Sequence, residues 1–256
     1  MASILVCMPA LESPSLIRVP AIVVAQLSLC HQWLQPWVLI ELAKCLSCNV
    51  MKDRRLKPVI LGGHGRLALP DGDLAYVPGF FSARVGDRLL SDLSGAVRWT
   101  QPRITLFGKQ VCSPRLAAWY CDRDAVYRYS GIVNQPLPWF PELLEIRHRV
   151  QQYMGLSFDG VLLNLYRTGQ DSMGWHSDDE KELGENPVIA SVSLGAPRRF
   201  LLRHRRSSDL PVHEVSLEHG SLLLMQGTTQ KNWRHSVPRI RNQDSPRLNL
   251  TFRRIN

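Results

Sequence analysis

The sequence has no apolar run long enough to cross a membrane and no leader of the secretory type. A transmembrane helix needs roughly 20 mostly apolar residues, and the apolar segment 1–50 is interrupted by four prolines. The same segment lacks the basic start, short apolar stretch and small-residue cleavage site of a signal peptide. We therefore expect no membrane partner and a cytoplasmic location.

Cysteine is scarce, and its placement does not indicate a disulfide framework. Four of the six cysteines lie in residues 1–50, while Cys112 and Cys121 stand alone later in the chain. This usage fits a reducing compartment. Cys45-x-x-Cys48 has the spacing of half a zinc or redox site, but no second C-x-x-C follows it. That reading stays a minor alternative.

Acidic residues are too few to balance the basic ones. The chain holds 22 Asp and Glu against 31 Lys and Arg, a formal charge of +9. The charges of residues 1–50 cancel, so the whole excess lies in residues 51–256. Such an excess is typical of proteins with a polyanionic partner, with nucleic acid first and an anionic membrane second. Charge that only aids solubility is the alternative.

The composition changes at Met51, which is followed by the polar run KDRRLKP. A chain of 256 residues suits one larger all-β domain with an appendage. We predict a poorly structured or wrongly assigned N-terminal extension over residues 1–60, with Met51 as a candidate start. A single folded domain is predicted over residues 61–256, and a monomer is expected.

Short strands dominate the predicted secondary structure. Apolar spacing predicts amphipathic helices over residues 83–93 and 138–154, and RITLFGKQVC (103–112) reads as a hairpin. Many short strands after a few helices indicate a mainly β fold with flanking helices (α+β), either a barrel or a double-sheet jelly roll. The strands are predicted at 74–77, 117–122, 127–132, 161–166, 187–194, 198–204, 213–217, 220–226, 232–237 and 247–255.

The motif His176-Ser-Asp178 supplies an imidazole and a carboxylate two residues apart. On an extended strand both side chains would point to the same face. His235, in NWRHSVP, offers a second imidazole. Two histidines and one carboxylate form the facial triad of non-haem Fe(II), so we predict these three residues as the metal ligands.

Polar and apolar residues alternate in PRLNLTFRRI near the end of the sequence. Strand parity places the apolar residues on one face and the polar ones on the other. Arginine offers a planar, permanently charged fork suited to carboxylates. A half-exposed edge strand is the alternative, but beside the triad we favour a carboxylate-binding face formed by Arg247, Asn249, Thr251 and Arg253.

These motifs together resemble the AlkB family of Fe(II)/2-oxoglutarate-dependent nucleic-acid dealkylases, closest to the branch with the mammalian DNA-repair homologues. The resemblance rests on NLYRTGQDSMGWHSDDE, ASVSLGAPRRFLLRH, HGSLLLMQGTTQKNWRHSVP and PRLNLTFRRI, in this order. It implies a double-stranded β-helix with Fe(II) held by His176, Asp178 and His235. It also implies 2-oxoglutarate clamped by Arg247 and Arg253, with Asn164 and Tyr166 beside Asn249 in its site.

The resemblance further implies a substrate and a base pocket. The expected reaction uses O2 to hydroxylate the alkyl group of bases such as 1-methyladenine or 3-methylcytosine, releasing an aldehyde, succinate and CO2. The base must leave its stack to be reached. Phe107 resembles a hairpin-tip wedge. The expected pocket residues are Tyr127, Tyr129, Ser130 and Glu180.

The expected partner is alkylated DNA, single- or double-stranded, with RNA as a further substrate to consider. An RNA demethylase of the same chemistry is the nearest alternative, and a non-catalytic nucleic-acid-binding jelly roll is a second. Location would follow the DNA, at the nucleoid in a bacterium or in the nucleus of a eukaryote. Phosphate contacts are expected from Lys181, Arg198, Arg199, Arg203, Arg205, Arg206 and Lys231.

Overall fold

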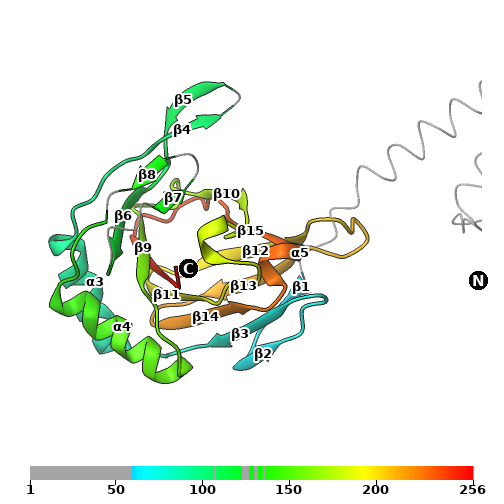
Figure 1. Ribbon diagram of the computed structural model, residues 1–256, viewed down its shortest axis with the longest axis horizontal. Coiled ribbons are helices and arrows are strands. Elements are labelled where there is room, and N and C mark those ends of the chain that lie inside the picture. The colour runs from blue at the N-terminus through cyan, green and yellow to red at the C-terminus, as the bar shows by residue number, and fades with distance from the viewer. Residues whose placement is uncertain (1–58, 107, 123–126, 130–131, 135, 256) are drawn as a thin grey trace, which may run out of the picture. The chain divides into compact units, whose positions relative to one another are not determined.

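Two large β-sheets form the framework of the folded part (Figure 1). The computed structural model describes residues 59–106, 108–122, 127–129, 132–134 and 136–255. In spatial order, the five-stranded sheet contains β1 (Val59–Ile60), β13 (His213–Leu217), β12 (Arg198–His204), β15 (Trp233–Val237) and β10 (Met173–His176). The seven-stranded sheet contains β2 (Gly65–Leu67), β3 (Asp73–Val77), β14 (Ser221–Gln226), β11 (Ile189–Gly195), β16 (Arg247–Arg253), β9 (Gly160–Tyr166) and β6 (Leu116–Cys121).

The two sheets enclose an apolar layer between them. Neighbouring strands are antiparallel in both sheets, except that β1 runs parallel to β13. Side chains from both sheets meet in one buried cluster, which includes Leu74, Leu162 and Leu223 from the larger sheet and Phe200, Leu202 and Val215 from the smaller. The predicted mainly β jelly-roll fold is confirmed. The predicted extension 1–60 lies almost wholly outside the described residues and stays a prediction.

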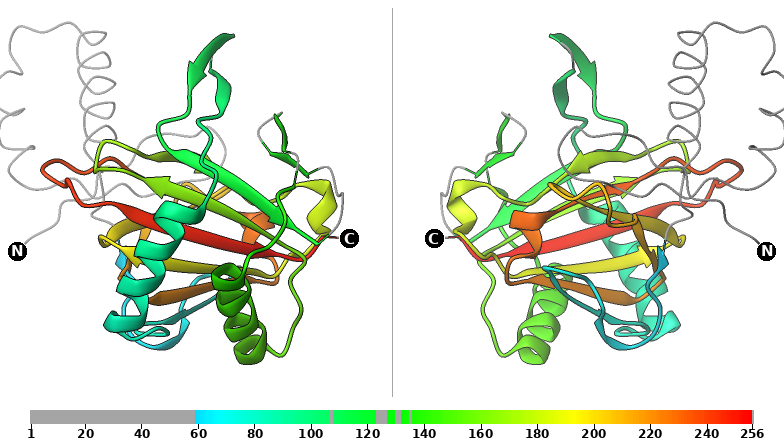
Figure 2. Two further views of the ribbon diagram at one scale, coloured as in Figure 1. Left: turned by 90° about the vertical axis from the view of Figure 1, so that its left-hand side faces the viewer. Right: turned by 90° about the vertical axis from the view of Figure 1, so that its right-hand side faces the viewer.

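Two helices cover the outer face of the seven-stranded sheet (Figure 2). These are α3 (Ala83–Ala96) and α4 (Pro141–Met154), close to their predicted ranges. Their buried residues recur at intervals of three or four, which places them on one helix face: Gly86, Leu89 and Leu93 in α3, and Leu143, Ile146 and Val150 in α4. No helix in the described ranges combines the length and apolar character that a bilayer crossing requires.

Two small hairpins lie outside the large sheets. β4 (Arg103–Leu106) and β5 (Lys109–Cys112) form the predicted hairpin, which projects from the body in Figures 1 and 2. β7 (Tyr127–Tyr129) pairs with β8 (Ile132–Asn134). The prediction of one strand over 127–132 was therefore wrong, because the range divides between β7 and β8. The sequence between them, Ser130-Gly131, has turn-forming composition, and both residues lie outside the described part.

Arg198 corrects the expected set of phosphate contacts. Its side chain is 1% exposed, and its guanidinium donates to the backbone carbonyls of Asp171 at 2.7 Å, Pro238 at 2.8 Å and Thr168 at 3.3 Å. Arg198 therefore ties the loop before β10 to the loop after β15. The reason is strand parity, because Arg198 shares the inward face of β12 with Phe200.

We expect Arg198→Met to lower the free energy of unfolding by about 3 kcal/mol or more, since buried carbonyls lose a charged donor. Arg199→Met is the matched control on the next residue. Its guanidinium side chain is 48% exposed and paired with Glu214, so a change below about 1 kcal/mol is expected. Urea unfolding of both variants measures the difference, and equal losses would contradict the structural role of Arg198.

Candidate metal site

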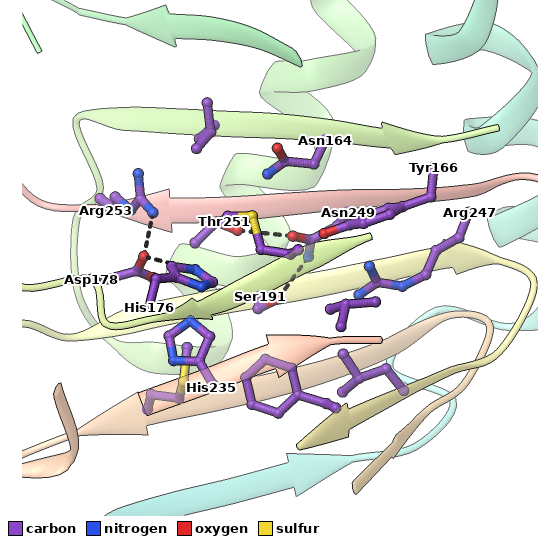
Figure 3. Close-up of a pocket in the computed structure, with 16 residues that line it drawn as sticks. Asn164, Tyr166, His176, Asp178, Ser191, His235, Arg247, Asn249, Thr251 and Arg253 are labelled. Carbon is purple, nitrogen blue, oxygen red and sulfur yellow. Dashed lines mark hydrogen bonds and ion pairs between the residues drawn. The ribbon is translucent and has the colours of Figure 1, made fainter. Parts of the chain in front are cut away.

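The three predicted metal ligands meet between the two sheets (Figure 3). His176 is the last residue of β10, and His235 stands opposite it in β15. Asp178 follows two residues after His176. One ligand atom from each residue lies within 4.8 Å of the other two. This arrangement can hold a metal ion and leaves the remaining coordination positions to other ligands.

Asp178 reaches the cluster from outside a strand, which corrects the prediction that both ligands share one. β10 ends at His176, and its register with β15 is irregular there. The following residues, Ser177 to Glu180, favour caps and turns over strands. Even so, the Oδ1 atom of Asp178 lies 3.8 Å from Nε2 of His176, and its side chain is nearly fully buried.

Both histidines are held in the neutral form that binds metals. Burial, and after it the neighbouring His176, lower the pKa of His235 to about 3. Burial likewise lowers the pKa of His176, although the charge of Asp178 opposes this. Nδ1 of His176 lies 2.9 Å from the carbonyl of Gly174. A carbonyl only accepts, so Nδ1 carries the proton and Nε2 is the nitrogen whose lone pair can bind a metal.

Acidification is expected to destabilise the metal-free protein from about pH 6.5 downward. His235 has a folded pKa of about 3, so below pH ~6.5 the unfolded chain binds more protons and stability falls with pH. From His235 alone the loss at pH ~5 is about 2 kcal/mol. Urea unfolding in EDTA measures it, and His235→Leu should flatten the curve; an unchanged pH dependence in that variant would contradict the assignment.

Asp178 is also paired with a buried arginine of β16. Nη2 of Arg253 lies 2.8 Å from Oδ1 of Asp178, and the two side chains are 2% and 3% exposed. Burial opposes ionisation of the carboxyl, but opposing causes, led by the positive charge of Arg253, outweigh it and lower the pKa of Asp178. Asp178 is therefore an anion, the form that binds a metal.

Arg247 brings a second buried cation to the same pocket. Its side chain is 1% exposed, and Nη2 donates to Oγ of Ser193 at 2.9 Å. Nε and Nη1 are buried without a hydrogen-bond partner among the described residues. Burial lowers the pKa of Arg247 to about 10, so it stays charged near neutral pH. A buried guanidinium that has no anionic partner in the described part of the chain, and two nitrogen atoms without hydrogen bonds, is well suited to bind an anion.

The other residues predicted to form the carboxylate face also line the pocket. This is the side expected from the alternation of polar and apolar residues along β16. The intervening residues Leu248, Leu250 and Phe252 pack on the opposite face against the helices. Nδ2 of Asn249 donates to Oγ of Ser191 at 2.7 Å. The pocket lining brings together Asn164, Tyr166, Arg247, Asn249, Thr251 and Arg253 with the three metal-site residues.

Comparison with known proteins agrees with this geometry. Residues 73–253 match the model of the 2OG-Fe(II) oxygenase superfamily. The chain is 39% identical over 192 residues to the Homo sapiens DNA oxidative demethylase ALKBH2, covering 72% of this chain and 73% of that protein. The chain belongs to the AlkB family of 2OG-Fe(II) oxygenases. This membership confirms the resemblance and, with it, the expected dependence on Fe(II) and 2-oxoglutarate.

Further relatives place the chain within the AlkB family. It is 40% identical over 186 residues to the Homo sapiens alpha-ketoglutarate-dependent dioxygenase alkB homolog 3, covering 70% of this chain and 64% of that protein. The chain thus spans 64% of this relative's length. A solved OsALKBH1 structure has a TM-score of 0.52 and 22% identity, covering 73% of this chain and 98% of that chain. That likeness supports the fold alone.

The residues present fit both groups that the AlkB family uses. Neutral imidazoles and an ionised carboxylate match the donor set of Fe(II). The orphaned donors of Arg247 match one carboxylate of a dicarboxylate such as 2-oxoglutarate. The polar wall between Arg247 and Arg253 supplies further donors and acceptors along the pocket.

The predicted base pocket is only partly described. Tyr127 and Tyr129 lie in β7, and their side chains fall outside the described part, as do Phe107 and Ser130 entirely. Glu180 is partly buried and lies two residues after Asp178, immediately before a short 3-10 helix (η1, Lys181–Leu183). Their contacts with a base stay predictions.

Sequence reasoning missed several residues that complete the site. Ser193 accepts a hydrogen bond from Arg247 and Ser191 accepts one from Asn249. Both serines alternate with the apolar residues Ala190 and Val192, a pattern that could have predicted them.

Phe200 stacks on His235 with ring centroids 5.0 Å apart. The others had no local signal, because their partners are distant in sequence: Arg115, whose Nε donates to Asn164 at 2.8 Å, and Gln230, which accepts from the Asp178 N–H at 2.9 Å.

Proposed function

We propose that this protein is an oxidative dealkylase of N-alkylated bases in DNA, of the 1-methyladenine and 3-methylcytosine type. One observation carries the proposal: a metal triad and an arginine with free donors converge on one buried pocket. Support comes from an AlkB-family relative named as a DNA oxidative demethylase, 39% identical over 192 residues.

The residues divide between the metal and the cosubstrate. His176, Asp178 and His235 would hold Fe(II), while Arg247 and Arg253 would hold the carboxylates of 2-oxoglutarate. When bound, Fe(II) with 2-oxoglutarate and O2 supplies the oxidation of the alkyl carbon, yielding an aldehyde, succinate and CO2. The chain's own contribution is to position these groups and exclude water.

Water exclusion follows from the apolar walls of the pocket. Leu162, Met173 and Phe200 line it together with the triad, and each is at most 9% exposed. A dry site strengthens every charge interaction within it. The stacked Phe200 also limits the rotation of His235, which keeps that ligand in place before the metal arrives.

Surface charge supports a polyanionic substrate. Three arginines are exposed and form no ion pair with any described residue: Arg203, Arg206 and Arg234. By contrast, Arg199 and Arg205 are neutralised by Glu214 and Asp179, so they are weaker candidates for phosphate contacts. The unpaired arginines, with the projecting β4–β5 hairpin, would meet the sugar-phosphate backbone. Glu180 would favour the positive charge of an alkylated base.

Repair of oligonucleotides bearing 1-methyladenine tests the proposal. Single-stranded DNA, duplex DNA and matched RNA would be incubated with Fe(II), ascorbate and 2-oxoglutarate, and the methyl group, formaldehyde and succinate measured. Loss of the methyl group from DNA with equivalent succinate is expected. Faster repair of RNA would overturn the choice of DNA. Nucleic-acid binding without succinate, by protein shown to bind the metal, would indicate a non-catalytic binding module.

A further inference from the structure

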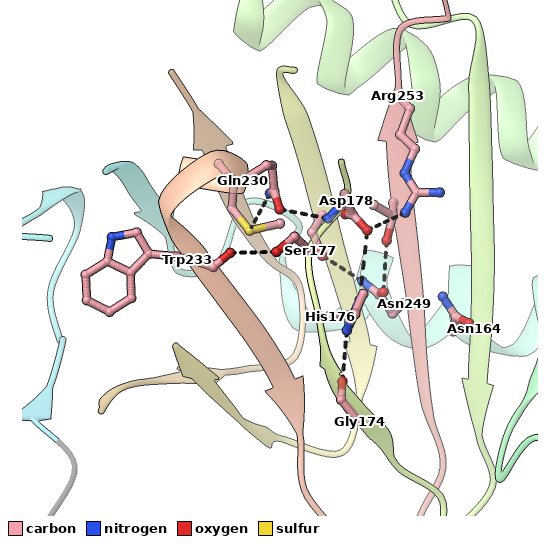
Figure 4. A network of polar contacts seen from close by, with 12 residues as sticks. Asn164, Gly174, His176, Ser177, Asp178, Gln230, Trp233, Asn249 and Arg253 are labelled. Atoms are coloured by element: carbon pink, nitrogen blue, oxygen red, sulfur yellow. Dashed lines mark hydrogen bonds and ion pairs between the residues drawn. The ribbon is translucent and has the colours of Figure 1, made fainter. Parts of the chain in front are cut away.

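Asp178 lies beyond the end of β10, so strand pairing does not fix its position. Instead, each of four consecutive residues has its own partner, and Figure 4 shows the contacts of the first three, His176, Ser177 and Asp178. Oγ of Ser177 donates to the carbonyl of Trp233 at 2.9 Å. The other contacts join His176 to the Gly174 carbonyl, the Asp178 N–H to Gln230, and Asp179 to Arg205.

Among these partners, only Gln230 forms a hydrogen bond with the backbone of a proposed metal ligand, the N–H of Asp178. Its side chain lies in the short helix α5 (Thr229–Asn232) and is 1% exposed. Oε1 accepts the Asp178 N–H at 2.9 Å, and Nε2 donates to Sδ of Met225 at 3.4 Å. Because a thioether sulfur can only accept, this contact orients the amide with its oxygen toward Asp178.

The helix that carries Gln230 is anchored without any help from a metal. Oγ1 of Thr229 accepts the Asp73 N–H at 2.8 Å. Nδ2 of Asn232 donates to the carbonyl of Asp71 at 2.9 Å. Nε1 of Trp233, the next residue, donates to the carbonyl of Pro70 at 2.8 Å. Gln230 therefore projects from a platform fixed to the segment before β3.

We propose that Gln230 is a positioning residue that sets the affinity and geometry of the metal site by fixing the turn at Asp178. The inference rests on the metal site of the proposed function. Without Oε1, the buried Asp178 N–H would be unsatisfied and the turn would relax. The carboxylate would then follow Arg253 rather than the two histidines. Residues that orient metal ligands typically contribute about 10–100-fold to metal affinity.

Co(II) binding in the absence of substrate is the direct test, measured by calorimetry and by the visible absorption spectrum. Gln230→Leu removes the acceptor at similar volume, and Gln230→Asn withdraws it by one methylene as a milder change. Asn232→Ala is the matched control, because it removes one contact of the same helix while the contacts of Thr229 and Trp233 still hold Gln230 in place. Melting temperatures of the metal-free proteins establish that each variant is folded.

The expected result is a Co(II) dissociation constant about 10–100-fold higher for Gln230→Leu, a smaller rise for Gln230→Asn, and altered Co(II) bands in both. Asn232→Ala should keep the parent affinity and spectrum. Unchanged affinity in a folded Gln230→Leu or Gln230→Asn protein would overturn the inference, as would an equal loss in Asn232→Ala. If the parent protein binds no Co(II), the metal site of the proposed function fails instead.

Discussion

His235→Ala is expected to reduce turnover by roughly a thousandfold or more, because it removes a proposed metal ligand and metal ions supply several kcal/mol of barrier reduction. The metal-free protein should remain folded, with a stability loss limited to the packing of the deleted ring against Phe200. His235 is a buried neutral ring, and no ion pair among the described residues includes it. Exposed His148 on α4 supplies a histidine control, since His148→Ala should change neither quantity.

Asp178→Ala should reduce turnover as much as His235→Ala does. Unlike that variant, it should also lower the free energy of unfolding substantially. It removes the carboxylate that compensates the buried charge of Arg253, which is 2.8 Å away. Removing one partner of a buried pair typically costs about 3–5 kcal/mol. Urea unfolding in EDTA, beside succinate assays, separates the two variants. Equal stability losses would show that the Asp178–Arg253 pair contributes nothing to the fold, and retained turnover in either variant would refute the ligand assignment.

Local periodicity predicted the parts of the site that lie on one strand. The alternation of β16 placed Arg247 and Arg253 on the pocket face and Leu250 on the helix-covered face, because side-chain parity depends on nothing beyond the strand itself. The pairing of His176 with His235 is different in kind. It depends on which strands become neighbours. The facial-triad chemistry made His235 a candidate ligand, and the family resemblance supported that choice.

The two corrections at the site share a physical cause. The sequence motif suggested that His176 and Asp178 share a strand, and the basic run suggested that Arg198 faces solvent. In the structure, distant polar groups make both positions possible: Gln230 holds Asp178 off the strand, and the carbonyl of Pro238 receives Arg198, which strand parity turns inward. Polar groups can be buried wherever tertiary partners satisfy them, and sequence spacing does not reveal those partners.

Arg247→Met is expected to raise the 2-oxoglutarate concentration needed for half-maximal succinate formation on the order of a hundredfold. Two charge-assisted hydrogen bonds to a carboxylate are worth roughly 3 kcal/mol together, which corresponds to that factor. Turnover at saturating 2-oxoglutarate should fall much less. Arg247→Lys keeps the charge but loses the planar fork, so an intermediate requirement is expected.

The same substitution should leave the ligand-free protein as stable as the parent or more stable. Nε and Nη1 of Arg247 are buried without partners among the described residues, and replacing such a group by an apolar side chain of similar length removes a desolvation penalty. Urea unfolding without ligand and the 2-oxoglutarate-induced rise in melting temperature of the Mn(II) protein measure the two effects. The buried charge that would serve 2-oxoglutarate binding therefore lowers the stability of the ligand-free protein. A destabilised Arg247→Met protein with an unchanged 2-oxoglutarate requirement would instead make Arg247 structural and move the carboxylate elsewhere.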